Sequence, residues 1–273
     1  DLNCRNPIEL RESPAKWFPY NKGGAYRKWY GNNDCFVNWK SDGEEMKEFT
    51  ATLPQGTWVR LKSREFYCLP NITYSGLSSG DFGCRLSEPG FLFDTKGSCI
   101  FAENDEQLLE LSALLNSKVS QIILEILCPT LDFSMVGVKK VPTILIEESI
   151  EPTRRAVSIA KSDWNEFEIS WGFTSVSFCK NETNNLSSAW LEWQKKCVQR
   201  LHELKTIEEG NNRLFIKAYE LQDEVAHEVS DDQINLARAD RERDSQRLIS
   251  YAIGCMMGRY SLDEPGPIYA HAG

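Results

Sequence analysis

Residues 104–127 read NDEQLLELSALLNSKVSQIILEIL, and their apolar side chains recur at three-and-four spacing. This spacing predicts a helical region with one buried face. Asn104 is expected to cap its start, and Pro129 to stop it. The spaced apolar positions are Leu108, Leu111, Leu115, Val119, Ile122, Ile123 and Ile126. This region divides the chain, because the sequence has a different texture on its two sides.

Upstream, short apolar runs alternate with turn residues, which predicts strands at residues 36–39, 57–63, 82–86, 91–94 and 98–101 and a short helix at 43–49. Downstream, residues 131–145 are expected to be extended, and long helices follow. We expect one apolar helical stripe to break at Gly210-Asn211, and a last helix at residues 231–257. The prediction is an α+β fold: a mixed, strand-rich domain at 1–150, then a long-helix spacer at 151–273.

Composition places the chain among ordinary globular proteins. It has 273 residues, 41% of them hydrophobic and 26% charged, with a net charge of −9. No segment approaches the roughly 20 apolar residues of a membrane span. The nine cysteines are scattered singly, which is typical of reduced thiols and of a cytoplasmic protein. Both ends look cut from a longer chain.

Motifs for the commonest chemistries are absent from the sequence. Neither GxxxxGK followed by Ser or Thr nor GxGxxG occurs, so no nucleotide-phosphate loop is expected. The cysteines lack zinc-site spacing. The three histidines, His202, His227 and His271, lie outside the strand-rich half, which argues against a histidine-based hydrolytic site. We therefore predict no catalytic residue and no metal site.

Residues 16–33, KWFPYNKGGAYRKWYGNN, combine four cations and six aromatic rings without an acidic residue. Cations neutralise phosphates and rings stack on bases, while Gly23-Gly24 would let backbone amides approach an anion. Nucleic acid is one interpretation of this pattern. The other is a strand and turn whose rings belong to the core, with Lys22, Arg27 and Lys28 merely solvated.

Residues 248–266, LISYAIGCMMGRYSLDEPG, form a second distinctive segment. An apolar helix that ends in a turn is typical either of a docking surface for a further domain or of burial within the helical arm. Both interpretations are open at the level of sequence.

Three segments resemble one family. They are WFPYNKGGAYRKWYGNNDCFVNWKSDGEEMK from Trp17, ITYSGLSSGDFGCRLSEPGFLFDTKGSCIF from Ile72, and RLISYAIGCMMGRYSLDEPG from Arg247. In wording and order they resemble the adenine-specific DNA methyltransferases of bacterial BREX phage-defence systems, the PglX family. The resemblance covers nearly the whole chain from Trp17 onward.

This resemblance implies that residues 1 to about 150 are a target recognition domain and the rest a helical spacer, as in specificity subunits of type I restriction systems. In the family, a separate N-terminal domain binds S-adenosylmethionine and methylates adenine, with an Asn-Pro-Pro-Tyr type motif for the flipped base. This chain has no Pro-Pro. It is therefore expected to hold no cofactor and to be no enzyme by itself.

The implied partners are double-stranded DNA and the missing N-terminal methyltransferase domain. The alternative is a protein-interaction module that docks other defence-system subunits or a phage inhibitor and has little DNA affinity. The resemblance gives no base-contact motif, so DNA-contacting candidates rest on side-chain chemistry alone. The candidates are Lys22, Arg27, Lys28, Trp29, Tyr30, Asn32, Asn33, Thr57, Arg60, Lys62, Arg64, Ser78, Ser79, Arg85 and Lys96.

Overall fold

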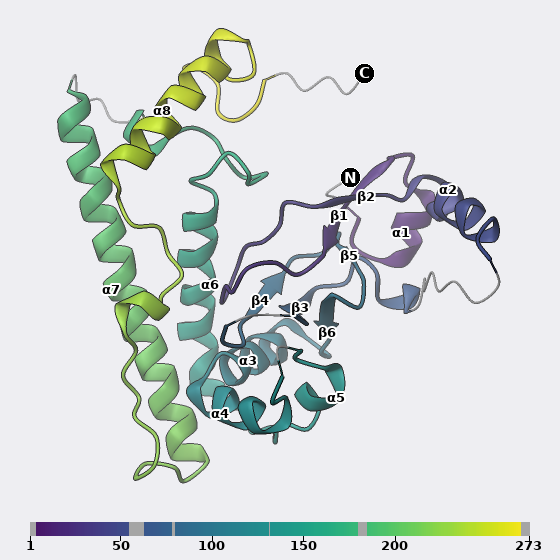
Figure 1. The fold of residues 1–273 in the computed structure, drawn as a ribbon, viewed down its shortest axis with the longest axis vertical. Coiled ribbons are helices and arrows are strands. Elements are labelled where there is room, and N and C mark those ends of the chain that lie inside the picture. Colours follow the sequence, from purple (N-terminus) through teal and green to yellow (C-terminus); the bar gives the residue numbers. More distant parts are fainter. Residues whose placement is uncertain (1–3, 55–62, 78–79, 131, 180–184, 269–273) are drawn as a thin grey trace.

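The computed structural model describes residues 4–54, 63–77, 80–130, 132–179 and 185–268. An α+β body is followed by long helices, so the predicted fold class is confirmed. In Figure 1 the body lies beside α6 and α7, which stand along one flank of the molecule, and α8 projects at the top. Within the described ranges, no helix is both long and apolar enough to cross a bilayer.

The body contains two small sheets. The first has the order β2 (Phe36–Asn38), β1 (Trp17–Asn21), β5 (Leu92–Phe93), with β1 antiparallel to β2 and parallel to β5. The second is antiparallel throughout, in the order β4 (Cys84–Ser87), β3 (Asn71–Ser75), β6 (Gly97–Ile100). Four of the five predicted strands are thereby confirmed. The strand predicted at 57–63 falls almost wholly outside the described residues.

The helices follow in chain order. In the body they are α1 (Pro7–Glu12), α2 (Lys40–Ala51), α3 (Asp105–Leu115), α4 (Lys118–Leu127) and α5 (Met135–Val138), with the 3-10 turns η1 (Arg64–Phe66) and η2 (Glu147–Ser149). Beyond it come α6 (Ile150–Trp164), η3 (Ser177–Cys179), α7 (Leu186–Ala218), η4 (Asp231–Gln233) and α8 (Arg241–Met256). One face of the second sheet, with Ile72, Tyr74 and Cys84, is buried against α3 and α4.

The helical region at 104–127 is confirmed, and it is divided into α3 and α4 at Asn116-Ser117. The Asn116 amide donates to the Cys84 carbonyl at 3.1 Å and accepts from the Cys84 N–H at 3.0 Å. It thus satisfies both backbone groups of Cys84 at the start of β4. Ser117 then caps α4 by accepting from the Ser120 N–H.

The break expected at Gly210-Asn211 is wrong, because α7 runs unbroken through both residues. Asn211 donates from its side chain to the Ala113 carbonyl at 2.8 Å, and Asn212 accepts from the Lys118 N–H at 3.0 Å. These bonds satisfy backbone groups at the end of α3 and the start of α4. The asparagine that suggests a helix end in the sequence therefore makes a polar contact between α7 and α3.

Two further expectations are corrected. The strand or extended segment predicted at 131–145 is interrupted by the short helix α5, which Ser134 caps by accepting from the Gly137 N–H at 3.2 Å. The last helix begins at Arg241 rather than Asp231, because Asp240 is its capping residue. The chain just before it is irregular, and there Ile234 and Leu236 are buried between α6 and α7.

The body and the long helices share continuous cores. Trp29 and Tyr30 of the body are buried with residues of α6 and α7, and α3 and α4 pack against Phe215 and Ile216 of α7. Helix α6 begins at Ile150, so the predicted division at residue 150 coincides with the start of a helix. The division into two domains itself stays a prediction.

Candidate nucleic-acid interface

The basic-aromatic stretch forms β1 and then a loop over residues 22–34 that reaches the long helices. The loop depends on glycine in two places. Gly24 has φ +139°, and a Cβ there would lie 2.8 Å from the Asn32 amide nitrogen. Gly31 has φ +120°, and its Cβ would lie 2.5 Å from the Arg27 side chain. L side chains rarely adopt these φ values, so the loop path requires glycine.

The centre of this loop is anchored to one carboxylate on α7. Trp29 is only 1% exposed, and its indole N–H donates to Glu208 Oε1 at 2.8 Å. The Lys28 ammonium donates to Glu208 Oε2 at 2.9 Å. Burial by itself would lower the pKa of Lys28, but the Glu208 carboxylate raises it above its usual value. Both donors are thus occupied within the protein.

Arg27 contacts the end of α6. Its guanidinium lies 5.0 Å from the Trp164 ring centroid and 3.9 Å from the Asp163 carboxylate, and it donates to the Asn235 carbonyl at 3.4 Å. Burial lowers the pKa of Arg27 and raises the pKa of Asp163. The Asp163 carboxylate also accepts from the Ala237 N–H at 3.0 Å. Arg27 therefore contacts two segments of the helical part, the end of α6 and the chain before α8.

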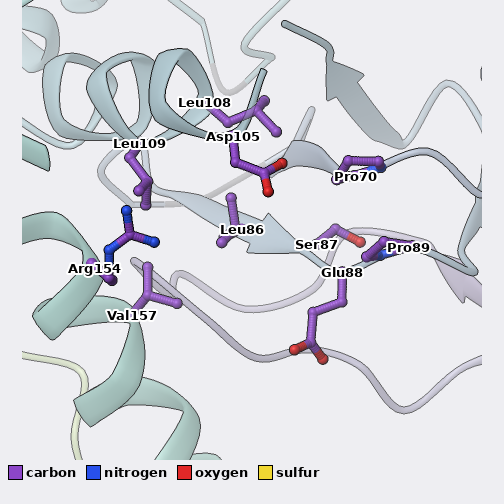
Figure 2. A pocket seen from close by; sticks show the side chains of 10 residues that line it. All are labelled: Pro70, Leu86, Ser87, Glu88, Pro89, Asp105, Leu108, Leu109, Arg154 and Val157. Atoms are coloured by element: carbon purple, nitrogen blue, oxygen red, sulfur yellow. The ribbon is translucent and has the colours of Figure 1, made fainter. Parts of the chain in front are cut away.

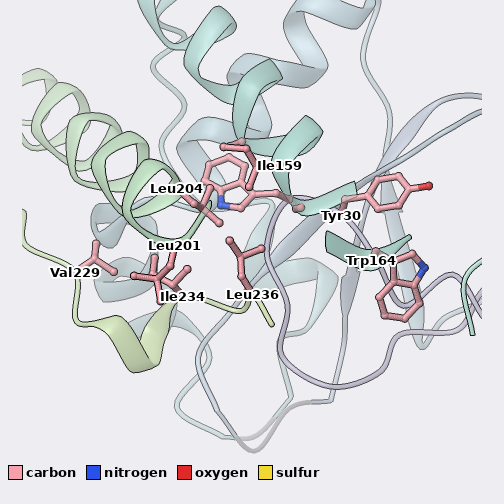
Figure 3. Close-up of a cluster of buried hydrophobic side chains, with 11 residues drawn as sticks. Tyr30, Ile159, Trp164, Leu201, Leu204, Val229, Ile234 and Leu236 are labelled. Carbon is pink, nitrogen blue, oxygen red and sulfur yellow. The ribbon is translucent and has the colours of Figure 1, made fainter. Parts of the chain in front are cut away.

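Figure 3 shows the buried cluster that this loop enters. Tyr30 lies in it near Trp164 of α6, with Leu201 and Leu204 of α7 and Leu236 of the chain before α8. The Tyr30 hydroxyl donates to Glu88 at 3.4 Å. Trp29 and Tyr30 are therefore structural here, as one interpretation of the sequence predicts. The cations differ from that interpretation, because Arg27 and Lys28 are paired rather than solvated.

Arg85 is deeply buried as well, with 2% exposure, on the face of the second sheet that carries Thr73 and Cys99. Trp29 continues the sheet beside it, donating to the Cys84 carbonyl at 2.8 Å and accepting from the Leu86 N–H at 2.9 Å. Burial lowers the pKa of Arg85 to about 10. In this conformation the protein itself covers Lys28, Trp29, Tyr30 and Arg85, and their contact with DNA stays a prediction.

The remaining candidates lie in different places. Asn33 is buried, and Asn32 donates to the Ala25 carbonyl within the loop. Arg64 pairs with Asp42 and lies 5.8 Å from the Trp39 ring. Lys22 and Lys96 are exposed. Thr57, Arg60, Lys62, Ser78 and Ser79 lie outside the described residues.

The structure brings Lys22 and Lys96 together at one edge of the body. A Cβ on Gly23 would lie 3.0 Å from the Lys96 carbonyl oxygen, and a Cβ on Gly97 would lie 2.9 Å from the backbone nitrogen of Lys22. The two backbones are therefore in contact. Within the described ranges neither ammonium has a carboxylate within 4 Å. These two cations are available to a phosphate backbone.

Two hollows adjoin the loop and the sheets. A groove of about 750 Å³ lies between the loop and the chain before α8, lined by three carboxylates, Asp34, Asp163 and Asp232, and two guanidiniums, Arg27 and Arg238. Figure 2 shows a pocket of about 290 Å³ where α6 meets α3 and β4, with Leu86, Leu109 and Val157 in its lining. The balance of charge in the groove and the apolar lining of the pocket do not favour a polyanion.

Sequence reasoning misses Glu208, Asp163 and Trp164, the partners that the helices supply. A signal for Glu208 is present. It follows Trp193, Cys197, Leu201 and Leu204 on the apolar stripe of α7, where the spacing predicts another apolar residue. A carboxylate on a buried stripe indicates a buried donor elsewhere in the chain.

The fold and this joint define an α+β protein in which a body with small sheets is braced against long helices by a buried basic-aromatic loop. No family model matches the chain. The sequence is 41% identical over 270 residues to the adenine-specific methyltransferase PglX of Lacticaseibacillus casei (strain Zhang), across 95% of this chain and 22% of that protein. It is 32% identical over 283 residues to the adenine-specific methyltransferase BrxX of Escherichia coli O9:H4 (strain HS), across 97% of this chain and 23% of that protein.

The chain thus spans about a fifth of the length of the curated relatives it matches. Nearly all of it is similar to one part of these methyltransferases, which confirms the resemblance found in its motifs.

Proposed function

We propose that this chain is the DNA-recognition part of an adenine-specific DNA methyltransferase of a bacterial phage-defence system of the BREX type. The observation that carries the proposal is the similarity to PglX along 95% of the chain, at 41% identity. A methyltransferase that extrudes one adenine must choose it by its neighbours, so a domain apart from the reacting centre reads base edges. In this proposal that domain is the α+β body, and the long helices hold its orientation.

The rest of the parent enzyme would bind S-adenosylmethionine and the extruded adenine in this proposal. The chain supplies neither a Pro-Pro motif nor a GxGxxG loop for those tasks. It would work in the bacterial cytoplasm as a reader of double-stranded DNA, with no catalytic residue of its own.

The surface that we assign to DNA is the edge that carries Lys22 and Lys96. Both are exposed and unpaired in the described structure, whereas Arg27, Lys28 and Arg85 are covered. Asn32 and Arg64 are partly exposed and stay on the list of proposed contacts, as do Thr57, Arg60, Lys62, Ser78 and Ser79. A focused patch is required, because the chain carries a net charge of −9.

The first test is fluorescence anisotropy of the chain with a pool of labelled random duplexes, at about 50 mM and about 200 mM salt. DNA recognition predicts binding that weakens steeply between the two salt concentrations. The paired variant Lys22→Ala plus Lys96→Ala should flatten the slope of log affinity against log salt by about 2. No binding at either salt concentration would contradict DNA recognition by this chain alone.

A matched control removes the same charge elsewhere. Lys195 and Lys217 are exposed on α7, so Lys195→Ala plus Lys217→Ala should leave the slope unchanged. Equal flattening by both pairs would mean that only the net charge matters, and the assigned edge would be wrong.

A protein-interaction module is the second candidate function. It is favoured by the acidic net charge of −9, because a negative protein is repelled by a polyanion.

A further inference from the structure

Helix α8 projects from the molecule and exposes an apolar face. Ile249, Ile253 and Met256 recur at helical spacing with exposures of 59%, 50% and 87%, and Met257 and Leu262 continue the face at 74% and 81%. Scattered exposed apolar residues are ordinary, but contiguous ones mark interaction sites. Figure 1 shows that the end of α8 lies away from the body and from α7.

The face is held in a fixed orientation by the opposite side of the helix. Near its start, the buried Asp244 accepts from the indole N–H groups of Trp190 and Trp193 on α7, each at 3.1 Å. Arg247 pairs with Asp244 at 2.9 Å and donates to the Glu166 carbonyl at 2.6 Å. These bonds fix α8 to α7 and to the chain just after α6 while leaving its outer side uncovered.

The turn after α8 is fixed as well. The Tyr260 ring packs against Gly254, where a Cβ would lie 2.6 Å from it, and the Tyr260 hydroxyl donates to Glu168 at 3.2 Å. The Tyr251 hydroxyl donates to the Ser261 carbonyl at 3.2 Å, and the Gly266 N–H to the Thr174 carbonyl at 2.8 Å. The exposed face is therefore preformed, which lowers the entropic cost of covering it.

The composition of the face argues against a nucleic acid as its occupant. From Leu248 to Gly258 the chain has no charged residue, and Arg259 is the single cation between there and Leu262. Its size argues against a separate protein chain. Stable interfaces between chains take about 20–30 residues on each side, whereas this face has five large apolar side chains. A tethered partner needs less area, because its effective concentration is in the millimolar range.

We infer that the apolar face of α8 docks against an apolar surface of the same polypeptide outside residues 1–273. This inference rests on the proposed function, in which the chain is part of a longer methyltransferase. The relatives support such a partner: they match this chain through α8, and nearly four-fifths of their length lies outside the match. The contact would set the position of the DNA-reading body relative to the rest of the enzyme.

Methionine footprinting tests the contact without using DNA. Met256 and Met257 should oxidise readily in the 273-residue chain and about fivefold or more slowly in the full-length enzyme, with a reporter peptide calibrating the oxidant. Met135, exposed on α5, serves as the reference within the body. Equal oxidation rates of Met256 and Met257 in the two proteins would overturn the inference.

A variant pair tests the same face. In the full-length enzyme, Ile253→Asp should restore the fast oxidation of Met256, whereas Leu191→Asp, at a similarly exposed apolar position on α7, should leave the protection intact. Both variants should leave the thermal unfolding midpoint of the 273-residue chain unchanged. Protection that both variants retain would also overturn the inference.

Two other outcomes separate the possible occupants and the two proposals. Protection that appears in the 273-residue chain alone as its concentration is raised would assign the face to a second copy and contradict the inference. Footprinting is independent of DNA, so protection together with absent DNA binding would support the docked face while the proposed function failed.

Discussion

The loop around residues 26–30 and the end of α8 around residues 249–257 differ in exposure to solvent, and each has the exposure that the composition of the other would predict. The first is rich in cations and is buried, whereas the second is apolar and is exposed. The loop is buried because α6 and α7 supply Asp163, Trp164 and Glu208 as partners. The end of α8 is exposed because no described segment of the chain covers its outer side. The location of a segment thus depends on partners that lie far away in the sequence.

The largest expected effect tests the buried side of this contrast. Glu208→Ala removes the acceptor of both Lys28 and Trp29 and leaves a buried ammonium unpaired. The free energy of unfolding should fall by about 3–5 kcal/mol. Urea unfolding followed by tryptophan fluorescence measures it.

Glu203→Ala, also on α7, is the control for this experiment. Glu203 pairs with Arg155 at the surface, so its loss should cost at most about 1 kcal/mol. Equal, small effects of the two variants would show that the loop is not braced by Glu208 and is free to meet DNA.

The next effect tests the rigid presentation of the exposed side. Gly254→Ala places a methyl group against the Tyr260 ring, and this overpacking should destabilise the turn after α8 by about 1–3 kcal/mol. Hydrogen exchange of the amides at 258–268 should become faster while exchange in α6 is unchanged. Gly210→Ala on α7, where a Cβ meets nothing within 4 Å, is the matched control and should leave both regions unaffected.

A smaller effect concerns the geometry of the brace. Arg27→Lys keeps the charge but loses the planar guanidinium over Trp164 and the bond to the Asn235 carbonyl. We expect a loss of about 1 kcal/mol in denaturant unfolding. Arg154→Lys, at an exposed pair with Glu151 on α6, should be neutral. If Arg27→Lys were neutral too, charge alone would suffice at this joint.

The smallest effect depends on pH. Burial raises the pKa of Asp163 above its unfolded value of 3.8, so the native state binds the proton more tightly than the unfolded chain does. The stability contributed by this group is present at low pH and is lost as pH rises through its folded pKa. The stability of the wild type relative to Asp163→Asn should therefore decline with rising pH above about 4. A difference that stays flat with pH would contradict the raised pKa.

Local signals that the structure confirms come from residues whose partners are near in sequence. The three-and-four spacing at 104–127 predicts helix, and Asn104 caps α3 by accepting from the Gln107 N–H at 2.9 Å. The two outer strands of the second sheet, β4 and β6, are predicted in the same way, from apolar runs between turn residues, whereas its central strand β3 is not predicted. Capping and periodicity act over three or four residues, so the sequence displays them directly.

Long-range polar contacts account for what the sequence did not predict. Asn116 divides the helical region because it bonds to β4, and Asn211 sits inside α7 because it bonds to the end of α3. Asn116 lies at an end of α3 that the sequence did not predict, whereas Asn211 lies inside α7 where an end was expected; each satisfies a distant backbone group. The candidate site changed for the same reason, since Lys28 and Arg85 are covered by parts of the chain that no local pattern connects to them.

Composition, short-range periodicity and motifs were enough to predict the α+β class, most of the strands, the capped helical region and the resemblance to PglX-type methyltransferases. The folded structure was needed to show that the cations of the loop brace the body against α7, and that the apolar end of α8 lies uncovered. No local pattern predicts these two features, because burial and ion pairing depend on which surfaces meet in the folded chain. For Lys28, that meeting joins it to a carboxylate 180 residues away.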